Sequence, residues 1–453
     1  MPVHQQLTPE GAMTSKDATD ARMLRKVIRA ASIGNFVEWF DFALYGFLAT
    51  EIANNFFPSS NSTAGLLKTF AAFAVAFALR PIGGAYFGAL GDRIGRKRTL
   101  AITILLMAGS TVALGILPTY SAIGIAAPIL LVLIRCVQGF STGGEYAGAC
   151  AFVLEHCRRD RRAWYSSFLP VSTFAAFGTA AIVSFGCSGL FGATAMTEWG
   201  WRLPFLIAAP LGVCGFYIRS KLDETPDFQQ VADNDTVASA PVREALRSHG
   251  LTMTKLGLFI CTTALSFYMF TTYMTTYLKV TAGHDASMTL LSNVLALMFA
   301  AALCPLVGRF SDRFGRRVTM FTASGLLVVG GLPAFLLAGN SGLAPAVFGQ
   351  LLLALGAVSC NVVTAVLLVE LFPTRVRYTA SALTYNLAYA VFGGTAPFIA
   401  TFLIEVTGDP LAPAYYLAVA SLVALVAAST LPETSRSPLS ATDPVSQQGA
   451  ITS

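Results

Sequence analysis

Five charged residues fall within long apolar stretches of the chain, where charge is costly. They are Glu38, Asp41, Arg80, Arg135 and Glu145. A charge at the centre of a bilayer costs about 2.5–3.5 kcal/mol on insertion scales, so such residues usually face a partner or a cavity. All five lie in the first half of the chain, and there we expect the chemistry that depends on charge.

Two of these acids could carry a proton. Glu38 and Asp41 lie three positions apart, on one face of a helix. Neighbouring carboxylates in a low-dielectric setting resist simultaneous ionisation, so one of them would hold a proton. The four histidines fall in predicted tails or loops, which leaves Glu38, Asp41 and Glu145 as the candidates for proton coupling. The alternative is a structural ion pair, such as Asp41 with Arg80 or Arg135.

The two arginines could bind an anion, because a guanidinium is always charged and can grip a carboxylate with two hydrogen bonds. Arg135 begins a run that contains Gln138, Glu145 and several glycines, and these glycines permit close helix packing. Arg80 precedes Pro81 and two glycines, which indicates a bent helix around a charge. Each arginine could serve substrate or proton coupling, and each could equally form a buried salt bridge within the bundle.

Aromatic and amide side chains occur at similar depths. Together, aromatic rings could cage a quaternary ammonium by cation–π attraction, whereas a single ring is more often packing or an interfacial anchor. Tyr277 and Tyr389 lie in the same predicted spans as candidates, and Asn293 is a further uncharged polar residue of the second half. The predicted substrate-binding residues are Arg135, Arg80, Trp39, Tyr45, Gln138, Tyr268, Tyr273, Asn361, Tyr385 and Asn386.

Two nearly identical charged loops lie between apolar runs, at residues 88–98 (GALGDRIGRKR) and 308–317 (GRFSDRFGRR). Each places an Asp at a helix end beside several Arg residues. Such a cluster could latch one conformation and release it in another; the alternative is a solvated topology signal. The predicted gating residues are Gly88, Asp92, Arg93, Gly95, Arg96, Gly308, Asp312, Arg313, Gly315 and Arg316.

A second set of repeated segments supports an internal duplication. Residues 153–155 (VLE) lead into a basic cluster that ends at Arg162, and residues 368–370 (LVE) lead into Arg375 and Arg377. Likewise, the segment 223–225 (DET) follows the sixth predicted span and 432–434 (PET) follows the twelfth. Parallel repeats of this kind build the two halves of a large class of transporters.

The elements that must position these residues are apolar runs of about 20 residues, the length that crosses roughly 30 Å of hydrocarbon. The chain is 55% hydrophobic and 12% charged, whereas a soluble domain has about 25% charged residues. We therefore predict an all-α membrane protein with twelve transmembrane helices in two six-helix, pseudo-symmetric halves. The predicted spans are residues 29–52, 66–88, 99–118, 124–149, 165–190, 202–219, 254–278, 288–308, 318–338, 343–369, 379–404 and 411–431.

The spans divide the chain into a tail, two bundles, a linker and a second tail. Most of the 30 Lys and Arg residues fall in the tails and in the loops that follow even-numbered spans, so the positive-inside rule places both termini in the cytoplasm. The predicted boundaries are 1–28 for the N-terminal tail, 29–220 for the first bundle, 221–252 for the linker, 253–432 for the second bundle and 433–453 for the C-terminal tail.

Other functional classes find little support. The eight cysteines show no paired spacing, so we expect neither a disulfide framework nor a metal site. We find no nucleotide-binding loop and no nucleophile–histidine arrangement in any span, so we expect no cofactor and no enzymatic activity. The basic residues are scattered over short loops, which argues against nucleic acid. The expected partners are a small-molecule substrate, protons and the lipid bilayer, and we expect a monomer.

These motifs resemble the major facilitator superfamily, whose G-x-x-x-D-R-x-G-R-[KR] signature is matched at both charged loops. Within it, five segments resemble the metabolite:proton symporters. That family imports proline and betaine, α-ketoglutarate, citrate, shikimate and related acids with protons, so the resemblance implies a bacterial inner-membrane importer that works by alternating access. The segments are residues 34–42 (GNFVEWFDF), 80–84 (RPIGG), 138–146 (QGFSTGGEY), 199–205 (WGWRLPF) and 222–226 (LDETP).

The resemblance leaves the substrate open. The first span and the segment after the sixth look most like the proline/betaine transporters, but the osmosensory members carry a long C-terminal coiled coil that this chain does not match. Arg135 and residues 267–274 (FYMFTTYM) look more like the carboxylate permeases. We therefore predict proton symport of a di- or tricarboxylate such as α-ketoglutarate. The alternatives are proton symport of proline or glycine betaine, a proton-driven exporter, and a sensor that binds solute without moving it.

Overall fold

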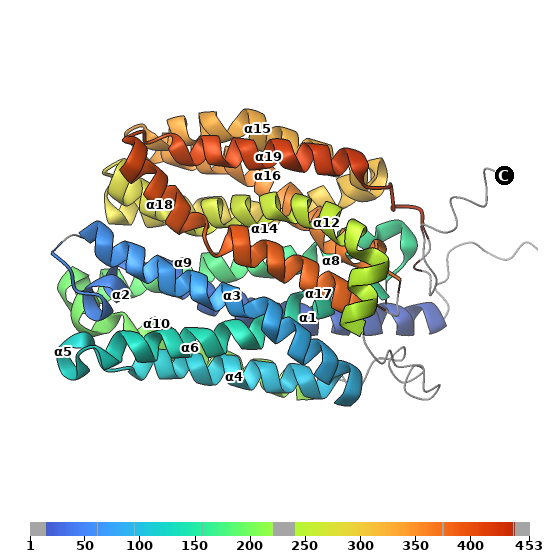
Figure 1. Ribbon diagram of the computed structural model, residues 1–453, viewed down its shortest axis with the longest axis horizontal. Helices are drawn as coiled ribbons and strands as arrows, with labels where there is room; N and C mark the ends of the chain where they lie inside the picture. Colours follow the sequence, from blue (N-terminus) through green and yellow to red (C-terminus); the bar gives the residue numbers. More distant parts are fainter. Residues whose placement is uncertain are drawn as a thin grey trace, which may run out of the picture.

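The computed structural model describes residues 15–60, 62–94, 96–155, 157–220, 241–373, 376–437 and 439. These residues form helices joined by short turns, and no strand occurs among them. The long helices run along the longest axis of the molecule (Figure 1). Helix α1 (Ser15–Phe47) begins and helix α19 (Ala412–Thr430) ends at the same end of the molecule, at the right of Figure 1. We call it the termini end and the opposite end the far end.

The N-terminal half, residues 15–220, packs α1 against α9, α3 against α6 and α4 against α10. Its elements are α1, α2 (Ala49–Phe56), α3 (Ser62–Ile94), α4 (Arg96–Ile116), α5 (Tyr120–Ile123), α6 (Ala126–Thr142), α7 (Glu145–Glu155), the 3-10 turn η1 (Arg159–Arg161), α8 (Arg162–Ser166), α9 (Phe168–Ala195), the π-helical turn η2 (Met196–Gly200) and α10 (Arg202–Ser220).

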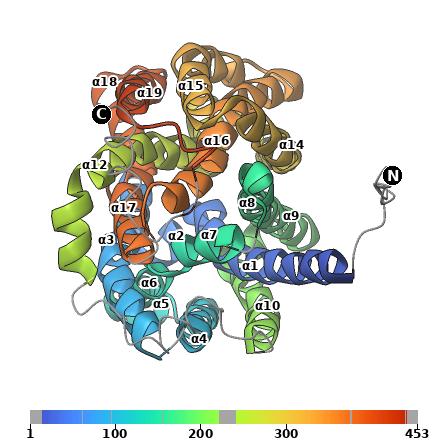
Figure 2. The ribbon, with the colours of Figure 1, turned by 90° about the vertical axis from the view of Figure 1, so that its right-hand side faces the viewer.

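The C-terminal half, residues 241–439, packs α15 against both α16 and α19, and α12 against α17 and α19. Figure 2, which looks onto the termini end, shows the two halves as separate groups of helices. The elements are α12 (Pro241–Tyr268), η3 (Met269–Tyr273), α13 (Met274–Thr276), η4 (Tyr277–Thr281), α14 (Ala286–Phe314), α15 (Arg316–Gly339), α16 (Leu343–Glu370), α17 (Arg377–Ala388), η5 (Tyr389–Gly393), α18 (Ala396–Thr407) and α19; η3, η4 and η5 are π-helical.

The all-helical fold is confirmed, and every predicted span coincides with a helix or a run of consecutive helices. Nine of these, among the described residues, are long and apolar enough to cross a membrane. The first, third and sixth predicted spans fall on α1, α4 and α10, which lie alongside the others (Figure 1). Membrane crossing by these three helices stays a prediction.

The division into two bundles and a linker stays a prediction, and the structure adds the conformation of the end of the linker. Residues 241–252, which we placed in the linker, form the first turns of α12, and residues 221–240 lie outside the described residues. Ala245, His249 and Met253 recur at four-residue spacing and are buried. This buried stripe holds the start of α12 against the bundle.

The backbones of α3 and α6 pack closely, and this contact sets the position of Arg80 along the helix axis. A Cβ atom on Gly139 would collide with the carbonyl of Ala76, and one on Gly143 would collide with the carbonyl of Arg80. Small residues permit such close approach between membrane helices. The contact fixes Arg80 on α3 beside the polar residues of α6.

Candidate functional site

Arg80 and Glu38 form a buried ion pair between α3 and α1. Arg80 Nη2 donates to Glu38 Oε1 at 2.9 Å, and Arg80 Nε donates to Thr142 Oγ1 on α6 at 3.0 Å. The side chains of Arg80 and Glu38 are only 1% and 2% exposed. Nη1 of Arg80 has no hydrogen-bond partner within the described part of the chain. A buried donor left unpaired costs about 1–3 kcal/mol, so this position favours a ligand that accepts a hydrogen bond.

Asp41 belongs to a second polar network. Its Oδ2 accepts from Gln138 Nε2 at 2.8 Å and its Oδ1 accepts from Thr111 Oγ1 at 2.6 Å. Arg135 Nη1 lies 3.8 Å from Asp41 Oδ2 and donates to Gln138 Oε1 at 2.8 Å. Gln138 thus bridges the arginine and the acid, and Asp41 forms one of the ion pairs considered as the structural alternative.

Each of the two neighbouring acids therefore has its own arginine, which the pattern of spacing alone did not specify. The formal charges of Arg80, Arg135, Glu38 and Asp41 sum to zero. Such a site disfavours ligands with a large net charge, because uncompensated charge in a buried setting is expensive.

Both guanidinium groups also lie over aromatic rings. Arg80 Cζ is 4.7 Å from the ring centre of Phe42 and 4.6 Å from that of Phe77, whereas Arg135 Cζ is 4.2 Å from that of Tyr45. Rings at this distance stabilise a cation. Tyr45 packs on Arg135 and donates to the Thr69 carbonyl at 3.1 Å, and its contact with substrate stays a prediction.

Three buried aromatic residues meet where the two halves join. The ring centre of Trp39 on α1 lies 6.5 Å from that of Tyr268 on α12 and 6.3 Å from that of Tyr389 in η5, and the two tyrosine rings are 6.3 Å apart. We call Trp39, Tyr268 and Tyr389 the aromatic cage. Arg80 Cζ is 5.4 Å from the Trp39 ring, so the cage adjoins the first ion pair. The Tyr268 hydroxyl is buried without a hydrogen-bond partner among the described residues.

The Trp39 indole is held in place by the N-terminal half. Its Nε1 donates to Asn35 Oδ1 at 3.0 Å. Asn35 Nδ2 in turn lies 2.9 Å from Ser172 Oγ and 2.7 Å from Thr173 Oγ1 on α9. These bonds fix the orientation of the ring, and Asn35 therefore acts as a positioning residue that the sequence analysis missed.

Several other predicted residues extend the cage toward the termini end. Tyr389 donates its hydroxyl to Asn361 Oδ1 at 3.3 Å, and its ring stacks on Tyr385 at 4.1 Å. Tyr385 stacks on Tyr146 of the N-terminal half at 4.7 Å. Asn386 donates to the Gly143 carbonyl. Tyr146, which we did not predict, thus completes an aromatic column across the junction.

Glu145 lies beside the aromatic column, and Tyr273 lies at another depth. Glu145 begins α7 and is buried, next to Gly144, whose carbonyl accepts from Tyr378 of the C-terminal half at 2.5 Å. Tyr273, predicted to bind substrate with Tyr268, lines a different pocket toward the far end. The reason is depth, since five helical residues rise roughly 7 Å.

The second charged loop forms a contact across the halves at the termini end. Asp312 Oδ1 accepts from Ala163 N and Asp312 Oδ2 accepts from Trp164 N, both at 2.9 Å. These are first-turn amides of α8, so Asp312 caps a helix of the opposite half. Arg316 Nη1 donates to Asp312 Oδ1 at 3.0 Å. This carboxylate therefore links α14 to α8.

Glu370 is the centre of the same cluster. Arg316 grips it with two hydrogen bonds, from Nε at 3.1 Å and Nη2 at 3.0 Å. Arg162 Nη1 of the N-terminal half approaches Glu370 Oε1 at 3.4 Å, and Thr434 Oγ1 donates to Oε2 at 2.7 Å. A reciprocal pair joins Arg377 Nη1 to Glu155 Oε1 at 3.1 Å. We call this cluster the termini-end gate: Glu155, Arg162, Asp312, Arg316, Glu370 and Arg377.

The predicted gating residues lie in different surroundings in the structure. Gly308 lets α14 approach α8, since a Cβ there would lie 2.8 Å from the Ala163 carbonyl oxygen. Gly315 has a φ of 100°, which favours glycine. Arg313 was expected in the cluster but is exposed, with its Cζ 5.3 Å from the Phe314 ring centre. Gly95 and the side chains at the other predicted positions of the first loop lie outside the described residues: Gly88, Asp92, Arg93 and Arg96.

We missed four members of the gate as functional residues: Glu155, Arg162, Glu370 and Arg377. The available signal was the repeated spacing, because each glutamate precedes its arginine by seven positions in both halves.

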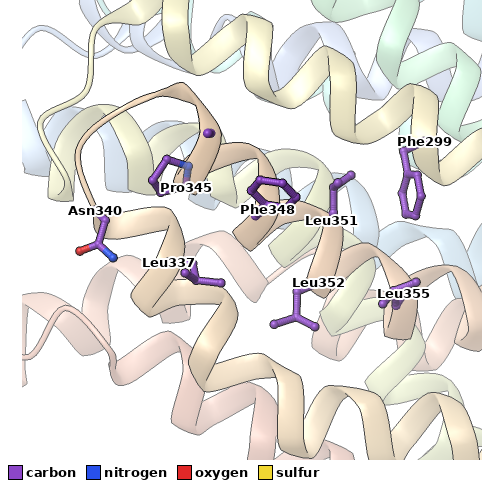
Figure 3. Close-up of a pocket in the computed structure, with 9 residues that line it drawn as sticks. Phe299, Leu337, Asn340, Pro345, Phe348, Leu351, Leu352 and Leu355 are labelled. Atoms are coloured by element: carbon purple, nitrogen blue, oxygen red, sulfur yellow. The ribbon is translucent and has the colours of Figure 1, made fainter.

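An apolar groove of ≈ 570 Å³ lies between α14, α15 and α16, away from the polar networks (Figure 3). Phe299, Phe348 and Leu352 contribute to its lining, and Asn340 stands at one end. A groove of this composition on a membrane protein suits acyl chains, so we do not assign it to the solute.

Comparison with known proteins agrees with this geometry. The model of the family described as "Major Facilitator Superfamily" matches residues 31–397. The proline/betaine transporter of Escherichia coli K12 is 39% identical over 445 residues, which cover 95% of this chain and 88% of the relative. The glycine betaine/proline/ectoine/pipecolic acid transporter OusA of Dickeya dadantii is 38% identical over 94% of this chain and 86% of its own length.

Two solved structures share the fold. The proton:xylose symporter XylE bound to 6-bromo-6-deoxy-D-glucose matches with a TM-score of 0.73 and 16% identity, over 92% of this chain and 97% of its own. The xylose transporter XylE from E. coli in a partially occluded inward-open conformation matches with a TM-score of 0.73 and 18% identity, over 92% and 99%. The family model spans most of the chain, and the relatives cover nearly all of it, so the protein belongs to the major facilitator superfamily.

Proposed function

We propose that the protein is a proton-coupled importer of a small zwitterion that carries a carboxylate and an ammonium group, such as proline or glycine betaine. The observation that carries this proposal is the aromatic cage beside the unpaired Nη1 of Arg80. The named activities of the two relatives support it.

The two ends of a zwitterion match the two parts of the site. The ammonium group would lie against the faces of Trp39, Tyr268 and Tyr389, where cation–π attraction contributes about 0.5–2 kcal/mol. The carboxylate would accept a hydrogen bond from Nη1 of Arg80. The other two nitrogens of this guanidinium already donate to Glu38 and Thr142. Cage and guanidinium adjoin each other across the Trp39 ring.

Charge balance separates the two substrate classes that the sequence left open. The four embedded charges already sum to zero, so a zwitterion leaves the site neutral, whereas a dicarboxylate adds two uncompensated negative charges. The relatives also favour the zwitterion. We therefore rank the predicted di- or tricarboxylate below proline and betaine as the substrate. Arg135 Nε and Nη2 are unpaired among the described residues and could donate to a second carboxylate.

Glu38 is the carboxylate best placed to couple a proton to the solute. It shares Arg80 with the position proposed for the substrate carboxylate. When the substrate takes part of that guanidinium, Glu38 loses part of its counter-charge, and its protonated form is favoured. Asp41, with three partners of its own, and Glu145, on α7, are the other two candidates.

Alternating access would move the solute between the ends. We place the termini end in the cytoplasm of a bacterial inner membrane, since the exposed Arg161, Arg309 and Arg313 gather there. The termini-end gate holds the described conformation closed on that side. Labelling of a cysteine introduced at Arg161 from one side of sealed vesicles tests the orientation.

The decisive experiment is uptake into proteoliposomes with an imposed pH gradient, comparing labelled proline, glycine betaine, α-ketoglutarate and citrate. We expect proline or betaine to accumulate and an uncoupler to abolish the gradient-driven part. Accumulation of a dicarboxylate alone would overturn the proposal, and net movement only in the outward direction would indicate an exporter.

Substitution then assigns the proton carrier. Glu38→Gln should abolish accumulation against a gradient and retain substrate exchange at equal pH. Asp41→Asn and Glu145→Gln test the other candidates in the same assay. Asp160→Asn, at an exposed position far from the cage, serves as the matched control. Full gradient-driven accumulation by Glu38→Gln would remove this residue from the coupling role.

A further inference from the structure

A second pocket lies between the halves toward the far end of the molecule. Its volume is ≈ 170 Å³, and both halves line it. The N-terminal half contributes α2 and the start of α3, and the C-terminal half contributes η3, α13, η4 and α18. The helices α2 and α18 mark this end of the molecule at the left of Figure 1.

The pocket continues the path that leads away from the aromatic cage. Tyr273 in its lining follows Tyr268 of the cage by five residues, and Thr401 follows Tyr389 by twelve. Thr50 follows Trp39 by eleven residues through α1 and α2. At about 1.5 Å per helical residue, these separations put the pocket roughly 7–18 Å beyond the cage. Chain segments that carry the cage therefore also line the pocket.

The lining mixes polar and apolar groups and carries one negative charge. Within the described part of the chain, Glu405 is the one charged residue of this lining, and its side chain is exposed. The apolar members are Ala53, Leu66, Val280 and Ile404. The polar neutral members are Thr50, Asn54, Thr63, Tyr273, Thr276, Thr281 and Thr401. The carboxylate and the ring face attract a cation, and the hydroxyl oxygens can accept hydrogen bonds from an ammonium group.

A tight contact closes the path between this pocket and the cage. Gly46 of α1 lies against Thr272 of η3, so close that a Cβ on Gly46 would be 2.7 Å from Thr272 Cγ2. Beside it, Leu66 and Phe70 of α3 pack with Phe398 of α18. These residues join opposite halves, and their separation would connect the pocket to the cage.

We infer that this pocket is a capture site, which binds the ammonium end of an incoming zwitterion before the contact between Gly46 and Thr272 opens. The inference rests on the proposed function and adds a binding site to it. Glu405 would act before the transport step, so it should affect the concentration dependence of uptake and leave the maximal rate unchanged.

The test is the kinetics of glycine betaine uptake by Glu405→Gln in proteoliposomes, with Glu198→Gln as control. Glu198 is an exposed acid in η2 that does not line the pocket. We expect Glu405→Gln to raise KM about threefold at an unchanged maximal rate and Glu198→Gln to leave both unchanged. The difference in KM between Glu405→Gln and the wild type should shrink when NaCl replaces sucrose at constant osmolality, because salt at 0.15 M screens charge beyond about 8 Å.

Three outcomes would overturn the capture site: equal KM shifts in both variants, which would indicate general surface charge; an unchanged KM in Glu405→Gln; and a fall in maximal rate alone. Filling the pocket with Thr401→Phe gives an independent test, since it should raise KM without removing a charge. If the wild type takes up neither betaine nor proline, the proposed function fails, and the capture site fails with it. That result is distinct from normal wild-type uptake with an unaffected Glu405→Gln.

Discussion

Glu155 and Arg377 form a 3.1 Å ion pair across the two halves, and Glu370 and Arg162 form the mirror pair at 3.4 Å with the roles of the halves exchanged. In each half the glutamate precedes the arginine by seven residues. The duplicated unit therefore does not pair within itself, because each glutamate meets the arginine of the opposite half. Two equivalent ion pairs between the halves therefore stabilise the closed termini end.

Glu370→Gln should destabilise the closed termini end. Breaking a buried ion pair by removing one partner costs about 3–5 kcal/mol, and Glu370 also binds Arg316 and Thr434. We expect the gradient-driven uptake rate to fall at least about tenfold. Asp160→Asn, which removes only exposed ion pairs, should change the rate by less than about twofold.

The alkylation rate of Cys157 should show whether the termini-end gate is open. Cys157 is half-buried between α7 and η1, and burial raises the pKa of its thiol to about 12. The thiolate is the reactive form, so opening should speed alkylation as the pKa returns toward 9.0. We expect Glu370→Gln to label faster than wild type, with Cys157→Ser as the background. Equal labelling rates would contradict a gating role for Glu370.

The contact of Gly46 with Thr272 makes a rescue experiment possible. Gly46→Ala would place a Cβ 2.7 Å from Thr272 Cγ2, so the far end should no longer close and uptake should fall severalfold. Thr272→Ser removes that methyl group and keeps the hydroxyl, whose oxygen is 3.5 Å away. The double variant should recover most of the uptake. Additive losses in the double-mutant cycle would show that the two positions do not interact.

Trp39→Leu should weaken substrate binding through the lost ring face. A cation–π contribution of about 0.5–2 kcal/mol corresponds to a rise in KM of roughly 2–30-fold for glycine betaine. Trp199→Leu is the matched control, since Trp199 is 45% exposed and remote from the cage. Asn35→Ala should give an intermediate rise in KM, because the indole stays but loses its anchor. An unchanged KM in Trp39→Leu would exclude the cage.

Helix packing between α3 and α6 leads to a prediction of stability. Gly139→Ala drives a Cβ into the backbone of Ala76, and forced overpacking typically costs about 1–3 kcal/mol. We expect a lower Tm and a lower yield of monodisperse protein in detergent. Gly109→Ala on α4 meets no atom within 4 Å, so its Tm should be unchanged or slightly raised by the better helix propensity of alanine. Similar Tm values for the two variants would contradict the packing argument.

Glu433 predicts a pH dependence outside the membrane. Partial burial opposes its charge, but the backbone amides of Arg316, Arg317 and Ser435 donate to it and hold its pKa below the ordinary 4.5. A lowered pKa stabilises the fold fully above pH 4.5, and this contribution is lost as pH falls through the folded-state pKa. Glu433→Gln should therefore lower Tm by about 1 °C at pH 7, and the difference should vanish at the acid end. A difference that grows as pH falls would contradict this sign.

The fold was predictable because span length and loop charge are local properties of the sequence. Apolar runs located the long helices of the described residues, and the embedded Glu38, Asp41, Arg80 and Arg135 marked the buried polar networks. The pairing was not predictable, because the choice of arginine for each acid depends on how α1 is rotated against α3 and α6. Spacing placed Glu38 and Asp41 on one face, yet each points to a different neighbouring helix.

The positions of other candidate residues could not be read from the sequence either. Tyr273 and Tyr45 have the residue type of cage members, but residue type specifies neither the depth of a side chain in the molecule nor the direction in which it points. Glu370 and Arg162 were visible only as a repeat, since the charges sit at helix ends where solvation is the ordinary expectation. Their function arises from contact between halves, which no single segment encodes.

The embedded charges and most of the cage rings come from different halves of the molecule. Glu38, Asp41, Arg80 and Arg135 lie in the N-terminal half, whereas Tyr268 and Tyr389 lie in the C-terminal half. Under the proposed function, the proton carrier and the arginine that binds the solute carboxylate come from one half, and two of the three cage rings come from the other. A chimera that keeps residues 1–220 and receives the second half of a relative with another solute should change what is carried and still run on protons.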